Sequence, residues 1–143
     1  MKNSKGFSLL ELLIVVAIIL IIATIAIPSL LRSRQAANES AAVANLRTIN
    51  TAEVTYLSSS GGNYGDLAAL VAAGLLDDTF IGTATRPKAG YVYMITASGS
   101  NYTATADPAS TNTGRFGSYS VPDAVVRYNT TLAPAGQGGR SVQ

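Results

Sequence analysis

The stretch LLIVVAIILIIATIAIPSLL, residues 12–31, is a run of twenty residues without a charge. As an α-helix rising 1.5 Å per residue it would extend about 30 Å, the thickness of the hydrocarbon core of a bilayer. A secretory signal peptide has a shorter apolar region, of about 7 to 15 residues, and ends at an A-x-A-like cleavage site that does not follow here. A buried helix of a soluble protein is disfavoured, because the rest of so short a chain cannot cover a helix that is apolar on every side. The stretch therefore predicts one membrane-spanning helix.

The charges on either side of this run leave its orientation open. Lys2 and Lys5 precede the run and favour a cytoplasmic N-terminus. Arg32 and Arg34 follow the run and favour the opposite orientation. The charge pattern alone does not decide between the two.

The composition predicts one small globular domain joined to an apolar anchor. The 143 residues are 48% hydrophobic and 13% charged, and the strongly apolar ones gather ahead of Arg32. Ten Lys and Arg residues stand against eight Asp and Glu residues, with no dense basic stripe. Nucleic acid is therefore not expected as the main partner, since neutralising phosphates requires clustered positive charge.

The composition also lacks two residue types, Cys and His, on which much catalysis and metal binding depends. The chain contains no Cys and no His, so disulfides, thiolate or imidazole metal sites and a Ser-His-Asp triad cannot be built. It carries neither a G-x-x-x-x-G-K-[ST] loop nor a G-x-S-x-G motif. Asp77 and Asp78 are adjacent, and adjacent side chains of an extended segment point apart, which favours solvated residues over an acid–base pair. We expect no enzymatic activity, no catalytic residue, no metal site and no cofactor.

A carboxylate, Glu11, directly precedes the apolar run. Burying an unpaired carboxylate in lipid is costly, so its position requires an explanation. In one interpretation Glu11 lies at the membrane interface, where the positive end of the helix dipole stabilises it. In the other it has a cationic partner. A chain cut just before Phe7 would carry a new α-amine four residues upstream, and Glu11 could pair with that amine on its own or a neighbouring chain.

The segment KGFSLLEL, residues 5–12, together with the apolar run and Pro28, resembles the N-terminus of type IV prepilins and pseudopilins. The resemblance implies that a prepilin peptidase cuts after Gly6 and N-methylates Phe7. It also implies that Glu11 neutralises the N-terminal amine of a neighbouring subunit during assembly. Ser8 and Leu10 stand where Thr and Ile are commoner in the family.

The resemblance implies a structural subunit of a type IV pilus-like filament, a helical homo-oligomer. Before assembly the precursor would be a single-pass protein of the inner membrane, surrounded by lipid, and an inner-membrane assembly platform would add it to the filament. The product would be an extracellular pilus or a periplasm-spanning filament. Two alternatives stay open: a pseudopilin of a type II secretion system, and a minor tip pilin that binds DNA or a surface. Major pseudopilins have an acidic calcium loop, whereas only Asp107 and Asp123 follow Asp78 here.

Pro28 is the position where this helix is expected to kink or melt. Leu20 stands where many members of the family have a helix-loosening glycine. A proline removes one backbone donor and clashes with the preceding turn. Any melting in a filament should therefore be centred on Pro28, and a simple kink is the alternative.

Residues 34–58 are predicted to continue the helix. They are rich in Ala, and their apolar residues have helical spacing, with Arg47 and Glu53 left for polar faces. This gives four parts: a leader peptide at 1–6, a transmembrane and assembly helix at 7–31, an amphipathic continuation at 32–58, and a globular domain at 59–143.

The globular part is expected to contain one short helix and a small antiparallel sheet. Asp66 should cap a helix from Leu67 to about Ala73 that ends at Gly74. Alternating apolar residues predict two strand pairs, 91–95 with 102–106 and 116–121 with 124–128. Tyrosines on these strands are expected in the core. The tail, 130–143, is expected to be mobile. The fold class is α+β, a long N-terminal helix packed on a small antiparallel sheet, as in pilins.

Overall fold

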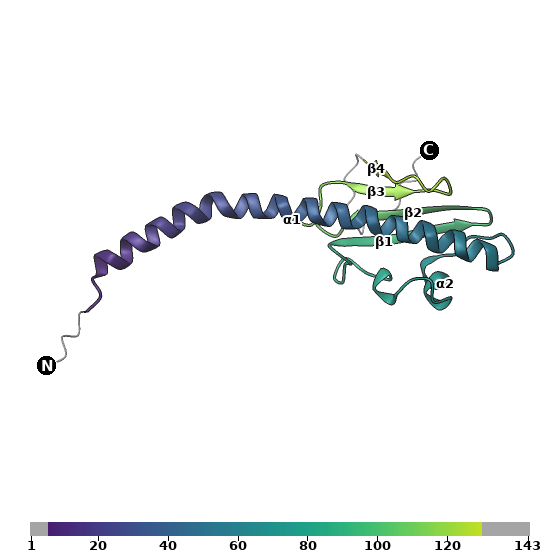
Figure 1. The fold of residues 1–143 in the computed structure, drawn as a ribbon, viewed down its shortest axis with the longest axis horizontal. Coiled ribbons are helices and arrows are strands. Elements are labelled where there is room, and N and C mark those ends of the chain that lie inside the picture. Colours follow the sequence, from purple (N-terminus) through teal and green to yellow (C-terminus); the bar gives the residue numbers. More distant parts are fainter. Residues whose placement is uncertain (1–5, 130–143) are drawn as a thin grey trace. The chain divides into compact units, whose positions relative to one another are not determined.

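A computed structural model describes residues 6–129 of the chain (Figure 1). The elements follow in the order α1 (Leu9–Ser59), α2 (Leu67–Ala72), the 3₁₀ helix η1 (Asp78–Phe80), β1 (Tyr91–Ser98), β2 (Asn101–Pro108), β3 (Gly117–Ser120) and β4 (Arg127–Asn129). The chain divides into two compact units, residues 1–33 and 34–143. The α+β prediction is confirmed: a long N-terminal helix is combined with a four-stranded antiparallel sheet.

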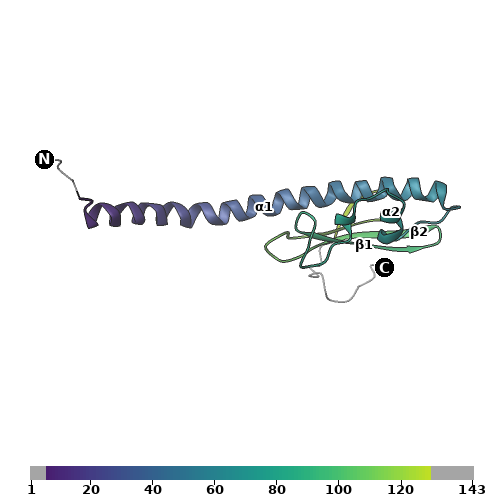
Figure 2. The ribbon, with the colours of Figure 1, turned by 90° about the horizontal axis from the view of Figure 1, so that it is seen from below.

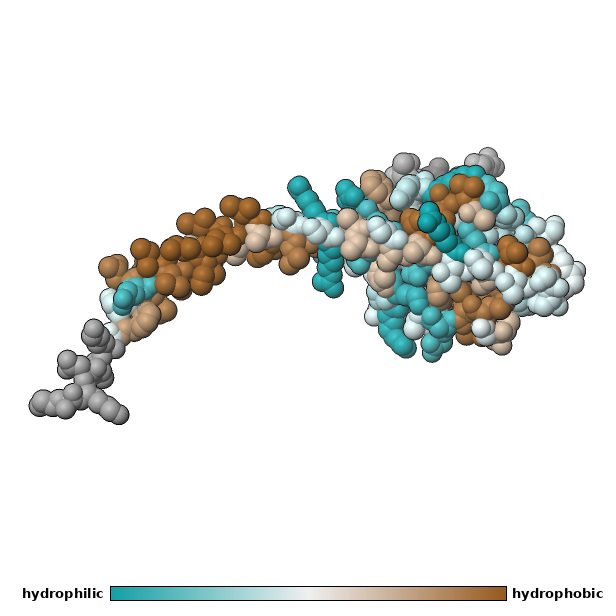
Figure 3. Space-filling model, viewed as in Figure 1, coloured by the Kyte–Doolittle hydropathy of each residue, from teal (hydrophilic) through white to brown (hydrophobic). Residues whose placement is uncertain are grey.

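The first unit contains the apolar part of α1. Its side chains are exposed on all sides of the helix. On the face drawn in Figure 3 they form a hydrophobic surface along this part of α1. Within the described residues, α1 is the one helix long and apolar enough to cross a membrane, with a mean hydropathy of 3.1 over eighteen residues and none of that window buried. Exposure of this surface to water is unfavourable, because full burial of each Leu or Ile side chain would contribute roughly 1.5–3 kcal/mol of free energy.

The second unit is built on the amphipathic half of α1. Ala42, Leu46, Ile49 and Ala52 recur every three or four residues and are buried in the core. They pack with Tyr91, Tyr93, Ile95, Tyr102 and other apolar residues of the sheet. Figure 2 shows this half of the helix as a layer against one face of the sheet.

The sheet is an antiparallel meander with the strand order β1-β2-β3-β4. Tyr93 lies opposite Ala106, and Ile95 lies opposite Ala104. Burial alternates along β1 and β2, so these residues face the helix whereas Met94, 63% exposed, points to the other face. The two predicted strand pairs are present. β4 begins at Arg127, later than expected, because Asp123 accepts a hydrogen bond from the Val125 backbone and holds a turn there.

The segment between α1 and the sheet contains the predicted short helix. Asp66 caps α2 by accepting a hydrogen bond from the Ala69 backbone nitrogen at 2.8 Å. Gly74 follows the helix with a φ of +71°, a conformation that favours glycine. The 3₁₀ helix η1 was not predicted. Asp77 caps it through the Thr79 backbone nitrogen at 2.9 Å.

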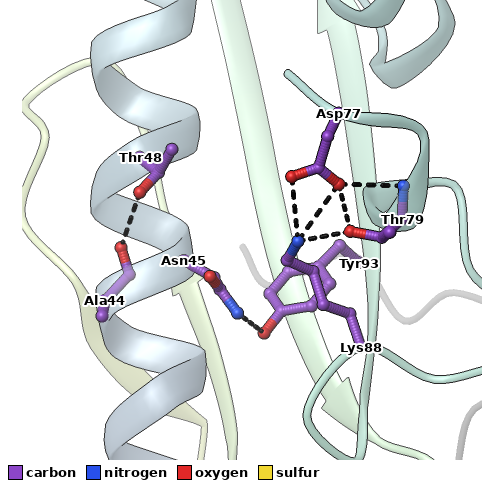
Figure 4. Close-up of polar contacts among 7 residues, drawn as sticks. All are labelled: Ala44, Asn45, Thr48, Asp77, Thr79, Lys88 and Tyr93. Carbon is purple, nitrogen blue, oxygen red and sulfur yellow. Dashed lines mark hydrogen bonds and ion pairs between the residues drawn. The ribbon is translucent and has the colours of Figure 1, made fainter.

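Polar contacts hold this segment to Lys88, which precedes β1, and hold α1 to β1 (Figure 4). The Lys88 ammonium lies 3.2 Å from Asp77, donates to the Thr79 hydroxyl, and sits 4.2 Å above the centre of the Phe80 ring. Asn45 of α1 donates to the Tyr93 hydroxyl at 2.9 Å. Asp77 and Asp78 are both exposed, and Asp77 serves as a cap and an ion-pair partner.

The expectation that Glu53 occupies a polar face of the helix is wrong. Its side chain is fully buried, and its Oε2 accepts a hydrogen bond from the Gly65 backbone nitrogen at 3.1 Å. Its other oxygen, Oε1, is buried and has no hydrogen-bond partner. The chain that returns from α1 towards α2 covers this face of the helix, which helical periodicity alone does not reveal. The expected mobile tail, 130–143, lies outside the described residues.

Candidate functional site

The candidate site is the start of the apolar helix. Residues 6–8 precede α1 without regular secondary structure, and the helix begins at Leu9. A Cβ built on Gly6 would meet no atom within 4 Å, and Phe7 is 80% exposed. Open, irregular segments of this kind are where proteases gain access to a backbone. The bond between Gly6 and Phe7 is therefore accessible in the described part of the chain.

Glu11 and Ser8 together form a capping box at the N-terminus of α1. Glu11 Oε2 accepts a hydrogen bond from the Ser8 backbone nitrogen at 3.0 Å. In return the Ser8 hydroxyl accepts one from the Leu10 backbone nitrogen at 3.3 Å. The first turn of a helix has unpaired N–H groups, and this S-x-x-E arrangement satisfies two donors around it. The role of Ser8 was not predicted, although the spacing of Ser8 and Glu11 is a recognisable local signal.

The capping box places the Glu11 carboxylate beside the predicted cleavage point. Ser8 is the residue after Phe7, so a cut before Phe7 would create a positive α-amine one residue from the nitrogen that Glu11 already binds. The dipole of the helix favours a negative charge at this end as well. Both interpretations of Glu11, an interfacial residue at a helix N-terminus and a partner for an amine, are compatible with this geometry. The pairing itself stays a prediction.

Pro28 lies inside α1, which is assigned as helix without interruption on both sides of it. The proline has no N–H, so the carbonyl four residues earlier, that of Thr24, loses its usual partner. The Thr24 hydroxyl meanwhile donates to the Leu20 carbonyl at 2.8 Å. The helix therefore has one backbone hydrogen bond fewer at Pro28. Melting of the helix at this position in a filament stays a prediction.

Several carboxylates of the second unit are engaged in ion pairs. Glu39 pairs with Arg115 at 3.0 Å, and hydrogen bonds from this arginine lower the pKa of Glu39. Asp123 pairs with Arg127, whose hydrogen bonds lower the pKa of Asp123. Burial raises the pKa of Asp107. Within residues 6–129 no group of three or more Asp, Glu, His or Cys residues is arranged to hold a metal ion.

Comparison with known proteins finds a methylation motif and similarity to two pilus proteins. The family model for the prokaryotic N-terminal methylation motif matches residues 1–27. The chain is 41% identical over 75 residues to the type IV wide pilus major component PilA4 of Thermus thermophilus, an alignment that covers 52% of this chain and 57% of that protein. It is 41% identical over 66 residues to the type IV major pilin protein PilA of Myxococcus xanthus, covering 46% of this chain and 30% of that protein.

These alignments span about half of the chain, and they extend over 57% and 30% of the two relatives. No solved structure matches the chain significantly. The similarity to pilins therefore comes from the methylation motif and an aligned stretch of 66 to 75 residues.

Proposed function

We propose that this chain, which matches the prokaryotic N-terminal methylation motif over residues 1–27, is a structural subunit of a type IV pilus, processed at Gly6-Phe7 and polymerised through α1. One observation carries the proposal. The segment that matches the methylation motif, residues 1–27, includes the start of α1, whose apolar part is exposed on all sides and long enough to cross a membrane. Such a helix is stable only in lipid or against other copies of itself, and a pilus subunit requires both environments in turn.

Processing would occur while the helix is in the membrane. A prepilin peptidase would remove residues 1–6 and methylate the new amine of Phe7. The open backbone around Gly6 supports this step, since nothing in the described residues crowds it. The mature chain would then comprise an assembly helix at 7–31, its amphipathic continuation at 32–58 and the globular domain from 59.

Assembly would exchange lipid contacts for contacts between helices. The cost of a carboxylate within the apolar bundle falls if a cation accompanies it, and the Phe7 amine of a neighbouring subunit would be that cation. An inner-membrane assembly platform would extract the subunit and add it to a helical homo-oligomer outside the cell. The two relatives are named as major pilus proteins, which favours a pilus subunit over a secretion pseudopilin or a minor tip pilin.

Two substitutions at Glu11 separate its charge from its capping role. Glu11→Gln keeps an acceptor for the Ser8 backbone nitrogen and removes the charge, whereas Glu11→Leu removes both. If Glu11 pairs with an amine, both variants should insert into the membrane and be cleaved after Gly6, yet both should give few filaments. Sheared surface filaments and membrane-held protein can be compared by immunoblot, and intact mass reports cleavage and methylation. Normal filament yield from Glu11→Gln would refute the pairing and leave the cap as the role of this residue.

The abundance of the chain in purified filaments tests the pilus assignment itself. A major subunit should account for most of the filament mass, beginning at methylated Phe7. A chain found only as a trace component, or only as processed monomer in detergent extracts, would contradict the proposal.

A further inference from the structure

A shallow groove lies between the amphipathic half of α1 and the connection from β3 to β4. It is lined by Arg47, Asn50, Thr51, Val54, Thr55 and Ala124. The Thr51 hydroxyl donates to the Arg47 carbonyl at 3.1 Å, and the Thr55 hydroxyl donates to the Thr51 carbonyl at 2.9 Å. Both hydroxyls are therefore bonded to the helix itself. Val54 is 57% exposed, and the accessible lining of the groove is mostly apolar.

One wall of the groove is a turn in an uncommon backbone conformation. Ala124 has a φ of +58°, in the left-handed region that residues other than glycine rarely adopt. The Asn50 amide donates to the Ala124 carbonyl at 3.2 Å, and the Ala124 nitrogen donates to the Val121 carbonyl at 2.8 Å. The Tyr102 hydroxyl donates in turn to the Asn50 side-chain oxygen at 2.8 Å. This wall is fixed in advance, so contact with a partner costs little conformational entropy.

A cation without a partner belongs to the same groove. Arg47 is exposed and makes no ion pair within residues 6–129. Residues 1–5 and 130–143 contain neither Asp nor Glu, so no side chain there can supply a carboxylate. A partner suited to this groove carries an apolar side chain with a carboxylate close to it.

The same unit presents that combination at η1. Ile81 directly follows η1 and is 53% exposed. Asp78, the first residue of η1, is exposed and makes no ion pair within residues 6–129. The Ile81 nitrogen donates to the Asp78 carbonyl at 3.1 Å, so a single turn holds the two residues close together. We call this pair the η1 knob. The other exposed carboxylates in the described part of this unit are engaged, Asp66 as a helix cap and Asp77 and Asp123 in ion pairs.

The groove and the η1 knob lie at opposite edges of the globular unit. Ala124 belongs to the connection between β3 and β4, whereas Lys88 joins η1 to the start of β1 through Asp77 and a bridge with Tyr91. β1 and β4 are the two edges of the sheet, and Figure 1 shows α2 and β4 on opposite sides of the amphipathic half of α1. Complementary surfaces at opposite edges of one chain make head-to-tail contacts, which close into rings or extend into helical filaments. The partner that this arrangement favours is a second copy of the chain.

We propose that in the filament the Ile81 side chain of one copy occupies the groove of the next copy, beside Thr51. The Asp78 carboxylate of the first copy then pairs with Arg47 of the second. This inference rests on the proposed function, because it places the contact between neighbouring pilus subunits. Each subunit offers its groove to one neighbour and its η1 knob to another, which adds a contact between globular units to the contacts between apolar helices.

The natural chain contains no cysteine, so an introduced pair of cysteines reports its own contact. Filaments of a full-length chain carrying Thr51→Cys and Ile81→Cys would be sheared from cells and oxidised with copper phenanthroline, which takes up the electrons as two thiols form a disulfide. Each copy carries both cysteines, so head-to-tail contacts give a ladder of multimers on non-reducing gels. A single cysteine links at most two chains. Thr51→Cys with Met94→Cys is the matched control, because Met94 is 63% exposed on β1.

A ladder from the cysteines at 51 and 81, absent from those at 51 and 94, is the expected result. Filaments that assemble without this ladder would overturn the inference and leave the pilus assignment intact. Absence of filaments from the natural chain would refute both. Dimers from Thr51→Cys alone would assign the groove to a symmetric contact and would also overturn the proposal.

Charge reversal tests the ion pair without cysteines and decides the matter if the cysteine pair blocks assembly. Arg47→Glu and Asp78→Arg should each lower the yield of sheared filaments about two- to fivefold, the size expected of one exposed ion pair. The combined variant should restore the yield, since opposite charges again face each other. Both residues are exposed, so the Tm of the detergent-solubilised chain should be the same in all three variants. Unchanged yields in the single variants, or a yield that stays low in the combined variant, would overturn the pairing.

Discussion

Glu53→Gln is expected to stabilise the globular unit at neutral pH, although it changes a fully buried residue. Burial raises the pKa of Glu53, the Gly65 backbone hydrogen bond opposes this, and the charge of Asp66 adds to the increase. The raised pKa means that the folded protein disfavours the ionised carboxylate. Buried Oε1 has no partner, so a negative charge there is poorly compensated. Tyr102, Tyr64 and Asp66 are the other titratable groups on this side of the helix.

The sign of the pH dependence follows from linkage. A carboxyl group whose folded pKa exceeds its unfolded value supports folding below the unfolded pKa, and that support is lost as the pH rises through the folded pKa. Each unit of difference corresponds to about 1.4 kcal/mol. The glutamine keeps an acceptor for the Gly65 nitrogen and places an NH₂ group with two unpaired donors where a protonated glutamic acid places one unpaired O–H. The variant should therefore gain stability relative to the natural protein as the pH rises above about 4.

We expect Glu53→Gln to raise the free energy of unfolding at pH 7–8 by about 1 kcal/mol. This corresponds to an increase in Tm of roughly 4–8 °C for a unit of this size. Thermal unfolding of the detergent-solubilised full chain, followed by near-ultraviolet circular dichroism of the tyrosines between pH 4 and 8, measures the difference.

Glu39→Gln is the matched control with the opposite sign. Hydrogen bonds from Arg115 lower the pKa of Glu39, so its ionised form supports folding above the ordinary carboxyl range and that support is lost on acidification. This variant should lose about 1 kcal/mol at pH 7, and the loss should shrink towards pH 4. A Glu53→Gln protein that is less stable than the natural one at every pH by a constant amount would refute the reasoning. It would show that the buried carboxylate is compensated when charged.

Two further predictions concern local geometry. Gly114→Ala should lower the free energy of unfolding by about 1–3 kcal/mol, because a Cβ there would overlap the buried Tyr91 hydroxyl. Tyr91→Phe should lower it by only about 1 kcal/mol, through loss of the hydrogen bond to Phe116. Urea titrations measure both changes, and a neutral Gly114→Ala would contradict the prediction. Asp66→Ala should lower the free energy of unfolding by about 1 kcal/mol through loss of the α2 cap. Asp78→Ala, at an exposed position, should change it by less than about 0.5 kcal/mol. Equal losses in the two variants would refute the capping role.

Local signals in the sequence predicted most elements of this fold. Helical periodicity predicted the continuation of α1, Asp66 and Gly74 bounded α2, and alternation around Tyr93 and Ala104 predicted the β1–β2 hairpin. The features that were missed depend on contacts between distant segments. Periodicity does not state which loop covers a helix face, so the burial of Glu53 by the chain around Gly65 could not be predicted. The 3₁₀ turn η1 is three residues long and is held partly by Lys88.

At the candidate site, too, local signals could be predicted from the sequence, whereas contacts between distant segments could not. Gly6, Phe7 and Glu11 were selected from a short contiguous motif, and the structure places them at an open helix start. The capping partner Ser8 could have been predicted, because the signal lies within four residues. The fastening of the 109–116 loop to Gln35, Asn38 and Glu39 joins residues about 75 positions apart. Nothing in either segment alone indicates the other.

The strand order β1-β2-β3-β4 bears on how quickly the globular unit forms. Each strand pairs with its neighbour in the chain, so the sheet can close as successive hairpins without waiting for a distant segment. Polar contacts join α1 to β1 and to the loop before β3 across 48 and 76 residues of sequence, and closing such loops carries the larger entropic cost. We therefore expect docking of the sheet on the helix to limit folding. A helix that is already formed would shorten the flexible part of those loops, so α1 would act as a template for the domain that forms on it.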